Sequence, residues 1–174
     1  MRSTRNRRTR ALALVVLLAW SGPLAGCGYH IRAPHDLSIQ TVYVPLIRST
    51  SFRREIQLQL TDLLIKEIEK RTPYKVVGNP EDADTVLEAT INFTDKNLVV
   101  ENPYNLPRQL NVTIQASVRW VHNPPLESER EAAPVIVSET VNFAEEIGES
   151  TTTAYYRAAQ NLATQMVDMM EQPW

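Results

Sequence analysis

Three segments of the chain alternate apolar and polar side chains, the pattern of strands that bury one face. The most regular covers residues 110–120, where even-numbered positions from Leu110 to Trp120 are apolar and odd-numbered positions are polar. A second covers residues 85–93, with these inward side chains: Leu87, Ala89, Ile91 and Phe93. In the third, at 135–143, only Glu139 interrupts the apolar face. We therefore expect three half-buried strands.

Two other segments repeat apolar side chains at the spacing of an amphipathic helix. The first follows N-cap candidates at 49–51, stops at Pro73 and has this apolar face: Phe52, Ile56, Leu60, Leu63, Leu64 and Ile68. The second starts near Ser150 or Thr151, is ended by Pro173 and has this apolar face: Tyr155, Ala158, Ala159, Leu162, Met166, Met169 and Met170. We interpret the methionines as core filling.

The order of the elements predicts the fold. Residues 39–47 are apolar on both faces, as in a strand near the middle of a sheet, and residues 74–77 form a brief strand after the first helix. Strand, helix and strand in this order favour a right-handed parallel crossover, and hairpin connections fall at 102–106 and 123–133. We predict a single α+β domain over 39–174, with two helices packed on one face of a four- to five-stranded mixed sheet in β-α-β-β-β-β-α order. The opposite sheet face would be polar and solvated.

The first 26 residues have the parts of a secretory signal peptide in order. Arginines come first, an uninterrupted apolar stretch follows at 11–20, and small residues lead to Cys27. The apolar stretch spans only about 15 Å as a helix, half of a hydrocarbon core, so it is too short to remain as a membrane anchor. We expect residues 1–26 to be removed.

Leu24-Ala25-Gly26-Cys27 resembles the lipobox of bacterial lipoproteins. The resemblance implies a diacylglycerol on the sulfur of Cys27 and a further acyl chain on the new N-terminus. Each buried methylene contributes about 0.8 kcal/mol and stable anchoring takes two chains, so such a group would hold the protein at a membrane. Residues 27–38 would then be a lipidated tether. Gly28 after the cysteine resembles the class of lipoproteins sorted to the outer membrane.

Composition excludes several classes of function. Without residues 1–26, thirteen basic residues face twenty acidic ones, and a net charge of about −7 disfavours nucleic acid as a partner. Cys27 is the single cysteine, so no disulfide can form within the chain. The three histidines, His30, His35 and His122, do not have the spacing of a metal site, and we expect none.

No residue pattern indicates catalysis. The chain has no glycine-rich phosphate loop. The adjacent Glu145 and Glu146 would point to opposite faces of an extended chain, which is unsuited to paired acid and base work. No histidine stands in a motif that suggests a base for a nucleophile. We expect a protein that is not an enzyme and has no cofactor apart from the lipid on Cys27. Turnover by the purified domain would instead indicate a hydrolase with an unrecognised site.

The ordered motifs resemble the LPS-assembly lipoprotein family, LptE. The resemblance covers these segments in order: the stretch from Leu24 to His30, the strand at 39–45, the helix that ends in Lys70-Arg71-Thr72, the strand at 74–77 and the Ala83-Asp84 element with the strand after it. It implies an outer-membrane lipoprotein on the periplasmic side that binds and helps assemble a β-barrel translocon delivering lipopolysaccharide to the cell surface. Its partners would be this barrel protein, lipopolysaccharide and the membrane.

The resemblance also implies contact with lipopolysaccharide through basic residues near one end of the domain. Lys96, Arg108 and Arg119 lie around the first hairpin or on the exposed sheet face and are the candidates. The alternative for each is an ordinary solvated surface charge.

A second function remains open, that of a lipoprotein activator of a peptidoglycan synthase or an accessory subunit of a secretion pore. Such domains share the strand, helix, strand opening and the alanine-aspartate element. The tether favours the first function. Residues 28–38 extend at most about 37 Å, which suits a barrel partner at the same membrane better than a target across the cell wall.

Overall fold

The computed structural model describes residues 35–50, 53–101, 103–104 and 107–171. The chain divides into two units, Met1–Arg32 and Ala33–Trp174, and every described residue belongs to the second. The expected signal peptide and Cys27 lie outside the described residues, as do Phe52 and Pro173.

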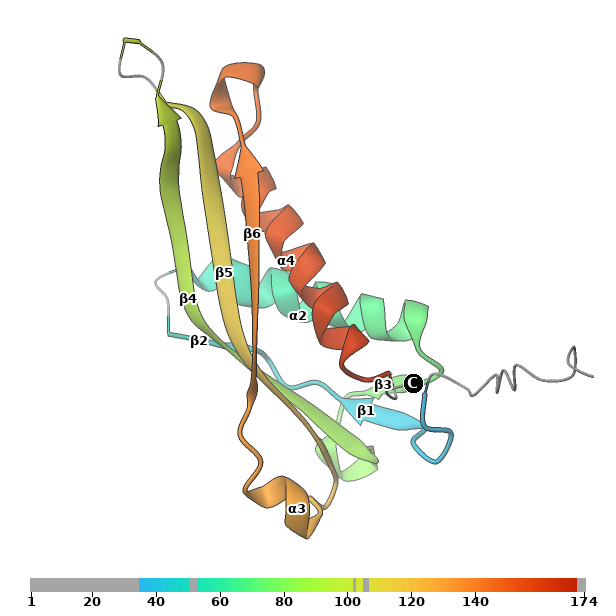
Figure 1. Ribbon diagram of the computed structural model, residues 1–174. Helices are drawn as coiled ribbons and strands as arrows, with labels where there is room; N and C mark the ends of the chain where they lie inside the picture. Colours follow the sequence, from blue (N-terminus) through green and yellow to red (C-terminus); the bar gives the residue numbers. More distant parts are fainter. Residues whose placement is uncertain (1–34, 51–52, 102, 105–106, 172–174) are drawn as a thin grey trace, which may run out of the picture. The chain divides into compact units, whose positions relative to one another are not determined.

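The described strands form one mixed sheet in the order β3-β1-β4-β5-β6, with β2 paired to β4 (Figure 1). The strands are β1 (Thr41–Tyr43), β2 (Arg48–Ser49), β3 (Lys75–Val77), β4 (Thr85–Glu101), β5 (Pro107–His122) and β6 (Val135–Phe143). β1 runs parallel to β3 and β4, and β2 runs parallel to β4. The β4-β5 and β5-β6 pairs are antiparallel.

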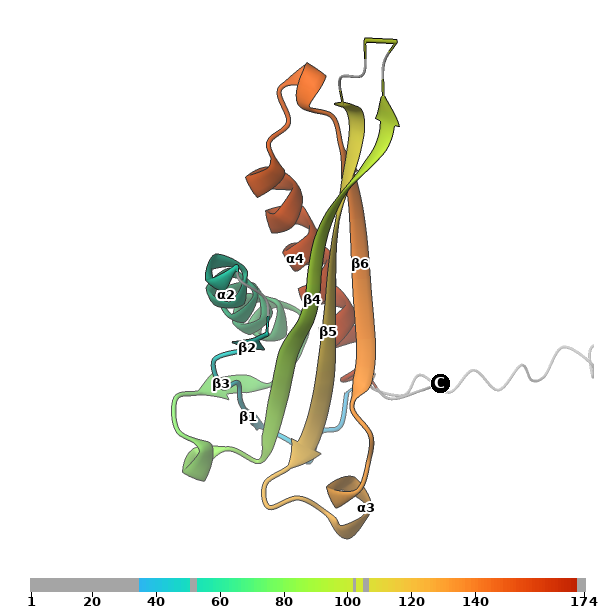
Figure 2. The ribbon, with the colours of Figure 1, turned by 90° about the vertical axis from the view of Figure 1, so that its left-hand side faces the viewer.

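Two long helices, α2 (Arg54–Arg71) and α4 (Thr151–Asp168), lie on the same side of this sheet (Figure 2). A short helix, α3 (Glu127–Arg130), lies in the connection from β5 to β6. Two 3-10 turns complete the described elements, η2 (Pro80–Asp82) and η3 (Glu145–Ile147). The α+β architecture and the mixed sheet with helices on one face are therefore confirmed.

The core lies between the helices and the sheet. From α2 it takes Ile56, Leu60, Leu64 and Ile68, and from α4 it takes Ala158, Ala159, Leu162 and Met166. The facing strands supply Leu87, Ile91, Val112, Ile114 and Val118. Both apolar helix faces are thus confirmed, and Ser150 caps α4 by accepting the N–H of Thr153 at 3.1 Å.

The first predicted strand is shorter than expected. Residues 39–47 were predicted as one strand, but β1 ends at Tyr43. Pro45 has no N–H for a ladder between two neighbouring strands, and the Ile47 N–H donates to the hydroxyl of Thr61 on α2 at 3.1 Å. The chain therefore leaves the ladder and rejoins β4 only at β2. The position of β1 near the middle of the sheet, between β3 and β4, is as predicted.

Two local predictions were wrong. The N-cap of α2 is Arg53, because Ser49 belongs to β2 and the hydroxyl of Thr50 bonds the β4 carbonyls of Ile91 and Asn92. Phe93 was expected to face inward but is 48% exposed, since a register shift between Ile91 and Phe93 moves the later side chains of β4 to the other face.

Candidate functional site

The far end of the β4-β5 hairpin carries apolar side chains that are not buried. Tyr104 is 83% exposed at its tip, and Ile147 is 78% exposed on η3, which lies at the same end of the sheet (Figure 1). We call the group formed by Leu98, Val99, Val100, Tyr104 and Ile147 the distal apolar surface; all five are exposed large hydrophobics. The sequence offered a weak signal for it, an isolated isoleucine in the polar stretch Glu145-Glu146-Ile147-Gly148.

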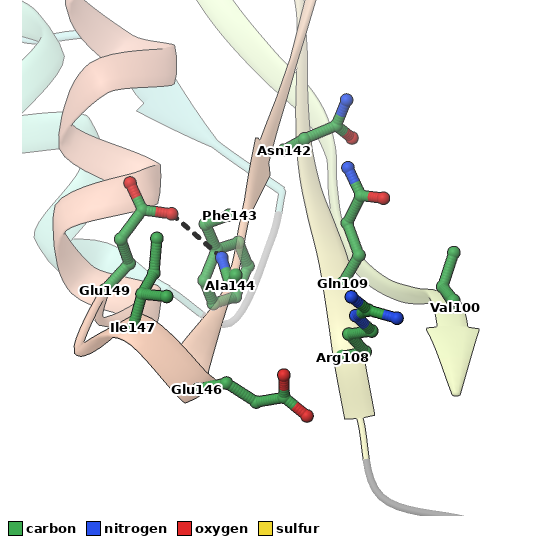
Figure 3. A pocket seen from close by; sticks show the side chains of 9 residues that line it. All are labelled: Val100, Arg108, Gln109, Asn142, Phe143, Ala144, Glu146, Ile147 and Glu149. Atoms are coloured by element: carbon green, nitrogen blue, oxygen red, sulfur yellow. Dashed lines mark hydrogen bonds between the residues drawn. The ribbon is translucent and has the colours of Figure 1, made fainter. Parts of the chain in front are cut away.

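A cavity of about 550 Å³ opens beside this surface, between the start of β5 and the turn after β6 (Figure 3). Pairing of β5 with β6 stops at Leu110 and Phe143, so Arg108 and Gln109 extend past the last residue of their partner strand. The chain meanwhile turns through η3 to reach α4. Gly148 completes that turn at φ 87°, a conformation that is energetically unfavourable for residues that have a Cβ. The cavity is therefore the space left where β5 extends beyond the end of β6.

Acidic groups of the turn line one side of the cavity. Glu149 accepts the N–H of Ala144 at 2.8 Å and pairs with Arg157 at 2.7 Å. The hydrogen bond from the Ala144 N–H, with the Arg157 guanidinium, holds the pKa of Glu149 below its ordinary value. Figure 3 shows Glu146 extending from η3 toward β5. Glu149 is therefore charged at neutral pH and already bonded within the domain.

Arg108 is the basic residue of this cavity. Its side chain is exposed and makes no hydrogen bond or ion pair to any other described residue. The exposed apolar side chains of Val100 and Ile147 line the same cavity. A cation next to apolar side chains can bind an amphipathic anion, with the guanidinium toward a phosphate or carboxylate.

Lys96 has a different environment from Arg108. Its ammonium bonds Glu145 at 3.0 Å and the Thr151 hydroxyl at 3.0 Å, and it lies 5.6 Å from the centre of the Phe143 ring. In the β4-β5 register it stands opposite the buried Val112, so it is on the helix-bearing face and not on the exposed one. Lys96 therefore joins β4 to the start of α4.

Arg119 lies far from the other two candidates. It pairs with Glu88 at 3.6 Å on the face opposite the helices, where a polar surface also includes Thr90 and Ser117. It lies eleven positions after Arg108 on β5, about 36 Å along the strand. The structure thus brings Lys96 and Arg108 to the same half of the sheet and leaves Arg119 in the other half.

The described residues hold no group of three or more His, Cys, Asp or Glu side chains placed to bind a metal ion. Within the same part of the chain, none of the helices combines the length and apolar character needed to cross a bilayer.

Helices on one face of such a mixed sheet also occur in solved bacterial lipoproteins. The solution NMR structure of uncharacterized lipoprotein B from Nitrosomonas europaea has a TM-score of 0.54 at 15% identity, covering 81% of this chain and 88% of that one. The crystal structure of rare lipoprotein B from Shewanella oneidensis has a TM-score of 0.51 at 12% identity, covering 75% of this chain and 93% of that one. These structural similarities concern the fold alone. Comparison with curated proteins gives no match.

The family model described as LptE, Lipopolysaccharide-assembly, matches residues 39–170. The chain belongs to this family, and the resemblance seen in the sequence is confirmed. Membership makes the protein a non-enzymatic lipoprotein of lipopolysaccharide assembly, at work in biogenesis of the outer membrane.

Proposed function

We propose that the protein binds a β-barrel translocon of the outer membrane and supports its assembly and its delivery of lipopolysaccharide to the cell surface. Lipid on Cys27 would anchor it in the periplasmic leaflet. The observation that carries the proposal is the distal apolar surface, which belongs to a chain whose family acts in lipopolysaccharide assembly. Exposed apolar side chains gathered at one place are typical of a surface that a partner covers.

The two ends of the domain suit different tasks. Residues 28–38 reach at most about 37 Å from the expected lipid, which keeps the domain near its membrane. The distal apolar surface is formed by the β4-β5 hairpin and η3, and we propose that this end enters the barrel. The polar sheet face around Thr90 and Ser117 would then meet the polar lumen that such barrels have.

Lipopolysaccharide would contact the cavity through Arg108. Of the three basic candidates, Lys96 and Arg119 already pair with carboxylates of the domain, whereas Arg108 pairs with none among the described residues. The exposed side chains of Val100 and Ile147, which also line the cavity, would face the apolar part of such a ligand.

Extraction of the full chain in mild detergent tests the barrel partner. We expect a large outer-membrane barrel protein to co-purify with it. The double variant Tyr104→Glu, Ile147→Glu should reduce recovery of the barrel at least fivefold. The matched control Leu37→Glu, Leu58→Glu changes two exposed leucines that lie away from this surface, 73% and 58% exposed, and should leave recovery unchanged.

Two outcomes would contradict the proposal. One is equal recovery of the barrel with both double variants. The other is recovery of a peptidoglycan synthase in its place, which would support the alternative function. Mass spectrometry of the mature chain separately tests the anchor, since a chain without lipid on Cys27 would remove the basis for placing the domain at the membrane.

A further inference from the structure

The outer edge of β6 pairs with no other described strand, because β6 is the last strand of the sheet. Along its nine residues, Val135–Phe143, it keeps one unbroken register with β5. An edge strand presents its outward N–H and C=O groups to solvent, and an extended chain can pair with them.

The outward backbone groups of β6 belong to its even-numbered residues. The Asn142 carbonyl accepts from Arg157 at 3.4 Å and the Ala144 N–H donates to Glu149, so neither bonds β5. Backbone groups alternate in direction along a strand. The N–H and C=O groups of Ile136, Ser138 and Thr140 therefore also point away from β5, and no described residue bonds them.

The other described edges of the sheet are protected. β3 has only three residues, and the outer side of β4 beyond Ile91 has register shifts at three places as well as charged side chains at Asp95 and Lys96. Short strands, bulges and charges all discourage edge pairing. β6 has one charge, Glu139, and its carboxylate is held against α4 by Asn161 at 2.9 Å and Gln165 at 2.7 Å. The β6 edge lacks these protections.

The surroundings of the edge indicate what it binds. Of the seven glutamates in residues 127–149, Glu129, Glu145 and Glu149 bond His122, Lys96 and Arg157. Glu127 and Glu131, beside the start of β6, are exposed with no described ion pair. Val135 and Ile136 are 50% and 63% exposed. The acidic surroundings disfavour a second copy of this chain and favour a basic segment.

We propose that the β6 edge, residues Val135–Thr140, binds an extended segment of a partner protein by strand addition. The segment alternates apolar and polar residues and carries basic residues at the end that lies beside α3. This interaction is separate from the distal apolar surface and does not require the barrel of the proposed function.

A designed peptide tests the inference on the full chain in detergent. The probe is an eight-residue strand of alternating Val and Thr with two lysines at each end, compared with the same strand flanked by glutamates. Fluorescence anisotropy should show the lysine peptide binding at least tenfold more tightly, with the ratio falling as salt rises. Hydrogen exchange should slow at Ile136, Ser138 and Thr140.

Two variants separate the charge from the strand pairing. Glu127→Lys with Glu131→Lys should reverse the preference toward the glutamate peptide, whereas the control Glu69→Lys with Glu81→Lys, with the same change in net charge, should keep it. Ser138→Pro removes one outward N–H without affecting the hydrogen bonds to β5. It should lower the affinity for both peptides at least fivefold.

Several results would overturn the inference. Equal binding of the two peptides, or an unchanged preference in the Glu127→Lys, Glu131→Lys variant, would exclude the acidic surroundings as the determinant. Protection at β3 or β4 instead of β6 would exclude this edge, and peptide-independent dimers would favour a second copy. The distal double variant Tyr104→Glu, Ile147→Glu should bind the peptide as tightly as wild type. The peptide test therefore remains valid even if the barrel interaction of the proposed function is not found.

Discussion

Thr41 and Asp84 bond each other in both directions. The Thr41 hydroxyl donates to the Asp84 carboxylate at 2.9 Å and accepts the Asp84 N–H at 2.9 Å. The same carboxylate oxygen accepts the N–H groups of Gln40 and Thr41, each at 2.9 Å. The pair joins the start of β1 to the chain just before β4 and gives the aspartate of the Ala83-Asp84 element a structural role.

This pair predicts a pH-dependent stability. The backbone N–H groups of Gln40 and Thr41, then the Thr41 hydroxyl, lower the pKa of Asp84. A carboxylate whose pKa is lower in the folded state contributes full stability above its unfolded value, about 4, and loses that contribution as the pH falls through the folded value. We expect Asp84→Asn to lower Tm at pH 7 and the difference from wild type to shrink toward pH 3. Glu81→Gln, an exposed neighbour, is the control, and a difference in Tm that does not change with pH would contradict this explanation.

Arg71 should couple the ends of the two long helices. Its guanidinium bonds Asp168 at 2.6 Å and Glu171 at 3.3 Å, and its side chain is only 28% exposed. The side-chain hydrogen bond to Asp168 raises the pKa of Arg71, so the group is always charged. A double-mutant cycle of Arg71→Ala and Asp168→Ala, followed by urea unfolding, should give a coupling free energy of about 1 kcal/mol. Additive effects would mean that the contact is too solvated to stabilise the helix pair.

Leu60 and Leu58 allow a matched comparison on α2. Leu60 is fully buried, whereas Leu58, two residues away, is 58% exposed. Removing a buried leucine side chain loses its transfer free energy and leaves a cavity, so Leu60→Ala should lower the free energy of unfolding by about 2–5 kcal/mol. Leu58→Ala should change it by less than about 0.5 kcal/mol. Similar losses from both substitutions would contradict the orientation of α2.

Gly148 should tolerate asparagine better than alanine. Its φ is 87°, and a Cβ built there meets nothing within 4 Å, so the cost of a substitution comes from the backbone conformation and not from a clash. Gly148→Ala should cost about 1–2 kcal/mol, and Gly148→Asn less, because asparagine adopts the left-handed region more readily. Equal costs, measured by chemical unfolding, would show that the turn relaxes to another conformation.

Arg108 and Lys96 should differ in the property that they affect. Arg108→Ala should weaken binding of purified lipopolysaccharide on the order of tenfold, since one charge-assisted contact is lost, and should leave Tm unchanged. Lys96→Ala should lower Tm, because Glu145 and Thr151 lose their shared partner. Binding assays and thermal unfolding on both variants distinguish the two roles. A fall in affinity for Lys96→Ala alone would move the proposed contact to Lys96.

The sequence predicted the elements whose pattern is set by burial. These elements are the apolar faces of α2 and α4 and the alternation from Leu110 to Val118. Each pattern reflects which side chains are buried, and all three predictions were correct. The predictions failed where the backbone departs from ideal pairing. The register shift after Ile91 turns Phe93 outward, although the apolar alternation of the sequence continues to Phe93. Pro45 ends β1 early, although the sequence stays apolar on both sides of it.

The candidate site was less accessible to sequence reasoning. Basic character selected Lys96, Arg108 and Arg119, but the contacts that distinguish them depend on partners distant in the sequence, such as Glu145 for Lys96. The cavity next to Arg108 arises because β5 extends beyond β6, a difference in length that side-chain patterns do not specify. Ile147 is a single apolar residue in a polar turn, so no periodic pattern in the sequence indicates its role.

The continuity of β4 has a mechanical consequence. One strand, Thr85–Glu101, pairs with β5 along its whole length and with β1 and β2 only in its first part. We therefore expect a force applied at the hairpin tip to pass along β4 into the part of the sheet where β1 and β2 flank it. The register shift between Ile91 and Phe93 bends β4 locally, so we expect the hairpin to pivot there when its tip is pushed.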